Sequence, residues 1–118
     1  MNAEPRTTGV RLLHMVDACN QVASFVEDRT RTDLETDEML RLALQYLVLT
    51  LGEAAKKIPP ETQAKAPTIP WRAIMASRDR MAHGYFDINL DVLWAMVSED
   101  IPALRPGLLG LRDSLGPE

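Results

Sequence analysis

Apolar residues recur at spacings of three and four along most of this chain, and no segment of useful length alternates apolar with polar residues. This period matches the 3.6 residues per turn of an α-helix and not the two-residue period of a strand. The chain is therefore expected to be all-α. A first helix is predicted over about residues 8–28 from one apolar stripe: Leu12, Met15, Val16, Cys19, Val22, Ala23 and Val26.

A second helix is predicted from the mid-thirties to about Lys57. Thr32 followed by Glu35 fits a capping box at its start, and Pro59 and Pro60 stop it. Between residues 42 and 49 only one residue is polar, a glutamine. A helix that is apolar nearly all round is expected at a bundle centre, in a subunit interface, or in both.

The second half of the chain has its own helix signals. The proline-rich stretch 59–70 predicts a connector with at most one short helical turn. Pro70 is expected to open a third helix that Gly84 ends, and Asn89 to cap a fourth that breaks at Pro102 before a short last helix. The predicted architecture is an antiparallel four-helix bundle with short extra helices.

The predicted domain occupies residues 10–113, between a disordered tail over residues 1–9 and a C-terminal tail over residues 114–118. A chain of 118 residues suits one hydrophobic core. Its single cysteine excludes an internal disulfide, and no signal peptide or membrane span is evident, so a cytoplasmic location is expected. The net charge of −4 argues against a broad basic surface for nucleic acid but leaves room for a small basic cleft.

Chemistry is concentrated between Arg78 and Tyr85, where two guanidiniums, an imidazole and a phenol occur within eight residues. A guanidinium binds phosphate through a two-pronged fork, and a histidine exchanges protons near neutral pH. Arg78 and His83 are the candidate catalytic residues, with Asp79, Arg80 and Tyr85 in support. No spacing of His, Cys or carboxylates predicts a metal site, and no cofactor is expected.

Helical geometry complicates this site. Five residues at about 100° each put Arg78 and His83 roughly 140° apart, so one straight helix does not aim both at one point. Either the helix unwinds at residues 81–84, or two chains pair so that both contribute to one cleft. Asp79 is one turn before His83, in reach of its N–H. In a structural interpretation, Arg78 and Asp79 form salt bridges and His83 caps the helix.

The sequence resembles the HepT group of the HEPN superfamily over roughly residues 10–113. The resemblance rests on an arginine, four residues, a histidine, one residue and a tyrosine, read here as Arg78, His83 and Tyr85. It is strengthened by Leu51-Gly52-Glu53-Ala54-Ala55-Lys56, Ile69-Pro70-Trp71-Arg72 and the helix around Trp94. One departure is Asp79, where asparagine is frequent in the group. A carboxylate there is expected to weaken RNA binding or to tune His83.

The resemblance implies a homodimeric toxin of a type VII-like toxin-antitoxin pair, a metal-independent endoribonuclease that cuts RNA such as tRNA or mRNA. It implies that Arg78 grips the scissile phosphate while His83 moves a proton. It also implies a partner, a minimal nucleotidyltransferase antitoxin that attaches AMP to Tyr85. The alternatives are a non-catalytic helical dimer that docks this partner and is modified by it, and a nucleotide-binding helper subunit.

Overall fold

The computed structural model describes residues 5–83 and 88–116, and its regular elements in these ranges are all helical. The all-α prediction is confirmed. The elements are α1 (Pro5–Val26), α2 (Arg31–Thr36), α3 (Glu38–Lys56), α4 (Pro60–Gln63), α5 (Trp71–His83), α6 (Leu90–Ala95), a π-helical turn (Met96–Asp100), a 3-10 turn (Pro102–Leu104) and α7 (Arg105–Ser114). No helix in this part of the chain is long and apolar enough to cross a membrane.

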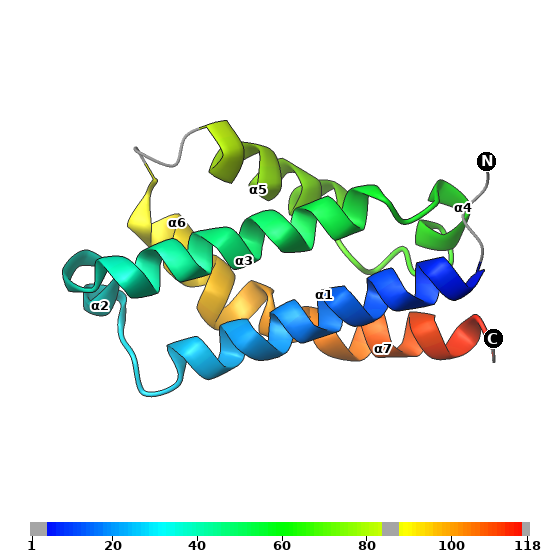
Figure 1. The fold of residues 1–118 in the computed structure, drawn as a ribbon, viewed down its shortest axis with the longest axis horizontal. Helices are drawn as coiled ribbons and strands as arrows, with labels where there is room; N and C mark the ends of the chain where they lie inside the picture. The colour runs from blue at the N-terminus through cyan, green and yellow to red at the C-terminus, as the bar shows by residue number, and fades with distance from the viewer. Residues whose placement is uncertain (1–4, 84–87, 117–118) are drawn as a thin grey trace.

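The long helices form an antiparallel bundle in which α3 lies between α1 and α5, and α7 lies along α1 (Figure 1). The end of α5 and the start of α6 are at one end of the bundle, and the start of α1 and the end of α7 are at the other. The first helix starts at Pro5, three residues before the predicted residue 8, and ends two residues before the predicted residue 28. Residues 5–9, expected in the tail, are therefore helical.

The predicted second helix is two helices, and the predicted cap is wrong. Thr30, not Thr32, caps α2, and the Asp33 carboxylate accepts the Thr30 backbone N–H at 2.7 Å. The chain then breaks at Asp37, whose side chain caps α3 by accepting the Leu40 N–H at 3.0 Å. This hydrogen bond and the ion pair with Arg29 lower the pKa of the Asp37 carboxyl. A carboxylate at the first turn also interacts well with the helix dipole.

The predictions for the connector after α3, for the Asn89 cap and for a break at Pro102 hold. The connector after α3 contains one short helix, α4. The Asn89 side chain caps α6 by accepting the N–H groups of Asp91 and Val92 at 2.9 and 3.1 Å. The fourth helix is α-helical to Ala95, continues as the π-helical turn Met96–Asp100 and breaks before Pro102, because proline cannot supply the N–H that a continuous helix needs.

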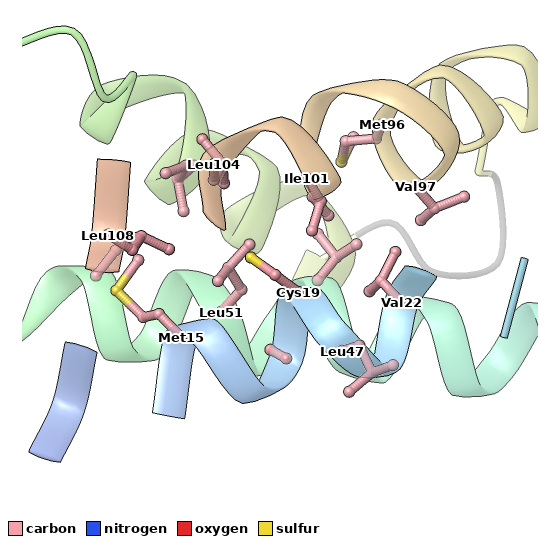
Figure 2. Packing of buried hydrophobic residues seen from close by; sticks show 14 of the residues in the cluster. Met15, Cys19, Val22, Leu47, Leu51, Met96, Val97, Ile101, Leu104 and Leu108 are labelled. Atoms are coloured by element: carbon pink, nitrogen blue, oxygen red, sulfur yellow. The ribbon is translucent and has the colours of Figure 1, made fainter. Parts of the chain in front are cut away.

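The core is one apolar cluster shared by α1, α3, α5 and the segment from α6 to α7 (Figure 2). Cys19 lies within it beside α3 and the segment from Met96 to Leu108, and burial raises the pKa of its thiol to about 11. A thiol that stays protonated and enclosed does not act as a nucleophile or metal ligand at neutral pH. Cys19 is therefore a packing residue.

The third helix, α3, has two apolar sides. One side carries Leu44, Val48 and Leu51 into the core. On the opposite side Met39, Leu42 and Tyr46 follow one another at spacings of three and four, and they are 84%, 48% and 64% exposed. We call these three residues the outer stripe of α3. This arrangement confirms the bundle-centre prediction and leaves an apolar surface of the kind that suits an interface.

Candidate functional site

Helix α5 carries the candidate residues, and the chain anchors its first turn firmly. The Ile74 N–H donates to the Pro70 carbonyl at 3.0 Å, so the helix begins directly after the proline. The Trp71 indole N–H donates to the Ala66 carbonyl at 3.1 Å. Trp71, Ile74 and Met81 are buried. Because these contacts fix the rotation of α5 against α3, they also fix where Arg78 points.

Arg78 lies where α5 packs against Gly52 of α3. A Cβ atom placed on Gly52 of α3 would overlap the Cβ of Arg78, and would lie 2.9 Å from its Cγ and 3.1 Å from the Ile74 carbonyl oxygen. Only glycine lets the two helices approach this closely. Gly52 therefore gives the stem of Arg78 its place on the buried side of α5.

Two carboxylates hold the Arg78 guanidinium. Its Nε donates to Oε1 of Glu53 on α3, and its Nη1 donates to Oδ1 of Asp79 at 3.0 Å. Both hydrogen bonds raise the pKa of Arg78, and the one to Asp79 contributes most. A guanidinium has five N–H donors, and the described residues use two of them, so as far as these residues go three are left for a phosphate. The Arg78 side chain is 24% exposed and thus reachable from solvent.

Asp79 therefore has a different partner from the one expected. Its carboxylate pairs with Arg78, and no Asp79–His83 hydrogen bond is found among residues 5–83 and 88–116. Asp79 still lies only roughly 40° around the helix from His83.

His83 is the last residue of α5, and it is exposed. The helix is continuous through this residue, so unwinding before His83 does not bring it to Arg78. Arg80 is exposed as well, on a face roughly 160° from Arg78. The structure thus brings Arg78 and Asp79 together, with His83 one turn away and Arg80 apart. Gly84 and Tyr85, the predicted helix end and modification site, lie outside the described residues.

Glu53 is the site residue that the sequence did not single out. It lies 25 positions before Arg78, and only the packing of α3 on α5 joins them. The signal was present as the Gly52-Glu53 pair near the end of the predicted second helix. Its meaning is structural: the glycine admits Arg78, and the next side chain binds it. The structural interpretation, in which Arg78 and Asp79 form salt bridges, agrees with the ion pair between these two residues.

No group of three or more His, Cys, Asp or Glu side chains within the described ranges is arranged to hold a metal ion. The functional groups at the end of α5 are instead a guanidinium, two carboxylates and an imidazole. In this set the guanidinium is a group that can bind phosphate, and the imidazole is one that can exchange protons.

An all-α bundle that ends one helix with an arginine, four residues and a histidine is the arrangement expected of a HEPN domain. A family model described as "Ribonuclease HepT-like" matches residues 15–108. The chain therefore belongs to the HepT-like family.

Curated relatives agree with this assignment. "Probable ribonuclease HepT" of Thermococcus cleftensis is 33% identical over 77% of this chain and 83% of its own length. "Putative RNase TTE0752" of Caldanaerobacter subterraneus is 30% identical over 80% and 84%. "Gamma-glutamylcyclotransferase and putative RNase MJ0434" of Methanocaldococcus jannaschii is 29% identical over 90% of this chain, which spans 48% of that longer protein. No solved structure gives a significant match.

Proposed function

We propose that this protein is a metal-independent endoribonuclease, the toxin of a pair whose antitoxin is a minimal nucleotidyltransferase. The observation that carries the proposal is the placement of Arg78, which Glu53 and Asp79 hold at the surface on the same helix as the exposed His83. Membership of a family described as ribonuclease HepT-like supports it.

The proposed reaction uses the 2'-hydroxyl of the RNA as nucleophile. Arg78 binds the non-bridging oxygens of the scissile phosphate and stabilises the charge that builds on them. A histidine takes the proton of the 2'-hydroxyl as its oxygen attacks phosphorus, or gives a proton to the leaving 5'-oxygen. The products are a 2',3'-cyclic phosphate and a 5'-hydroxyl. His83 is the residue proposed for this proton transfer.

We propose further that the cleft is completed by a second copy of the chain. Arg78 and His83 are roughly 140° apart on an uninterrupted helix, so one chain does not point both side chains at the same phosphate. A partner chain would supply the second of these side chains. The outer stripe of α3, Met39, Leu42 and Tyr46, supports such pairing because large exposed apolar side chains favour an interface. Glu53 continues this side of α3 toward Arg78, so pairing here would bring the partner close to the site.

A second candidate is a helical dimer that cuts nothing and serves only as the docking partner and substrate of the nucleotidyltransferase. The two carboxylates on Arg78 favour it, since they offset the charge that would attract RNA. The two candidates differ in what removal of the His83 side chain does to toxicity, because only the enzyme needs it.

Modification of Tyr85 by AMP is the proposed means of control. A phosphate and an adenine added two residues from His83 would occupy the RNA site and repel its backbone. Co-expression with the nucleotidyltransferase encoded beside this protein is therefore expected to raise its intact mass by whole AMP units. The gain is expected to vanish in Tyr85→Phe and to persist in Tyr46→Phe, the matched control. An unchanged mass beside an active partner would contradict covalent control.

A further inference from the structure

A groove between the first turns of α1 and the last turn of α3 lies next to the Arg78 site. Its cavity measures about 460 Å³, within the size range of small-ligand sites. Thr7, Val10, Arg11 and His14 of α1 form one wall, and Thr50, Glu53, Ala54 and Lys57 of the α3 side form the other. We call it the α1–α3 groove.

The chemistry of this groove is that of a phosphate site. Arg11 and Lys57 bring positive charge from opposite walls, and Thr7, Thr50 and His14 add hydrogen-bonding groups. Among the described lining residues the one carboxylate is Glu53, and it is already bound to Arg78. The groove is thus locally basic on a chain whose net charge is −4. By contrast, a pocket of about 440 Å³ between α3, α5 and residues 96–104 has a mainly apolar lining, and Asp100 is the carboxylate among its described lining residues.

Glu53 joins the groove to the candidate site. The same side chain lines the groove and accepts the hydrogen bond from Arg78 Nε. Arg78 and the groove therefore lie on either side of Glu53. A ligand with a phosphate bound at Arg78 lies beside the groove. A nucleic acid strand carries phosphates at regular intervals, so a strand bound at Arg78 requires cationic contacts on either side of the reacting phosphate.

We propose that the α1–α3 groove binds the RNA backbone beside the scissile phosphate, with Arg11 and Lys57 contacting a neighbouring phosphate. This inference rests on the proposed ribonuclease function and assigns it a second binding subsite. The groove contributes to affinity and to placement of the strand, whereas Arg78 and His83 act on the bond that breaks.

Adjacent lysines provide a matched test. Lys57 lines the groove, while Lys56 is the preceding residue, exposed, of equal charge and outside the lining. Binding of a single-stranded RNA oligonucleotide is measured against salt concentration in the His83→Ala background, which keeps the RNA intact. Lys57→Gln is expected to lower the slope of log K against log salt by about 0.7, the value for one phosphate contact on a single strand. Lys56→Gln is expected to leave the slope unchanged.

Cleavage by the otherwise unaltered protein separates the possible failures. Lys57→Gln is expected to raise KM about 10-fold with little change in kcat, because a lost binding contact acts on ground and transition states alike. If Lys57→Gln and Lys56→Gln change RNA binding and KM equally, or if Lys57→Gln changes neither, the groove proposal is overturned. The ribonuclease function still stands in that case if the unaltered protein cuts RNA. If the unaltered protein neither binds nor cuts RNA, the ribonuclease function falls, and the groove proposal falls with it.

Discussion

His83→Ala is expected to lower the rate of RNA cleavage about 10³-fold, because it removes the group that moves a proton in the transition state. The side chain is exposed at the end of α5, so its loss is expected to change the free energy of unfolding by no more than about 0.5 kcal/mol. The measurement is single-turnover cleavage at saturating protein, with urea denaturation to confirm that the fold is kept.

Arg72→Ala is the matched control on the same helix. Arg72 is an exposed cation in the first turn of α5, and its replacement is expected to leave the cleavage rate within about twofold. The same pair decides between enzyme and docking partner in cells. Growth arrest that His83→Ala relieves, with partner binding retained, supports the enzyme. Arrest that survives His83→Ala would remove the catalytic role of His83.

Gly52→Ala is expected to lower the free energy of unfolding by about 2 kcal/mol. The added methyl would meet the stem of Arg78 and the Ile74 carbonyl, and neither is the movable end of a side chain. The helices must separate, so the Arg78 guanidinium is also expected to leave Glu53, with a loss of RNA cleavage. Alanine favours helix more than glycine, which offsets part of this cost.

Gly110→Ala makes the same change in α7, where a Cβ meets nothing within 4 Å. Here only the helical preference remains, and stability is expected to rise by about 0.7 kcal/mol. Urea denaturation measures the free energy of unfolding of both variants. Because only Gly52 lies at a close contact between α3 and α5, Gly52→Ala is expected to lower this free energy and Gly110→Ala to raise it. A Gly52→Ala protein as stable as the unaltered one would contradict the packing described here.

The sequence alone predicts the helical class and the long helices well, because apolar period and proline positions are local signals. It fails at the start of α2. A Thr-x-x-Glu pattern at Thr32 and a Thr-x-x-Asp pattern at Thr30 differ little in sequence, and only the latter is used. The break at Asp37 is equally hard to foresee, since a single aspartate fits both the interior of a helix and its cap.

The candidate site residues on α5 are found from the local sequence, whereas their partner Glu53 on α3 is not. Arg78, Asp79 and His83 fall within six residues and attract notice together. Glu53 becomes their neighbour only through the packing of α3 on α5 at Gly52, a contact that no local pattern reveals. The α1–α3 groove is hidden for the same reason, because Arg11 and Lys57 are far apart in the chain.

If Arg78 of one chain acts with His83 of another, as proposed, mixed dimers of two inactive variants are expected to regain activity. Arg78→Ala and His83→Ala proteins are each expected to be nearly inactive alone. When they are unfolded together and refolded at equal concentration, half of the dimers contain one of each, and each of these has one cleft with both residues intact. We expect the mixture to recover roughly a quarter of the unaltered cleavage rate. A mixture no more active than its components, although mixed dimers form, would contradict it.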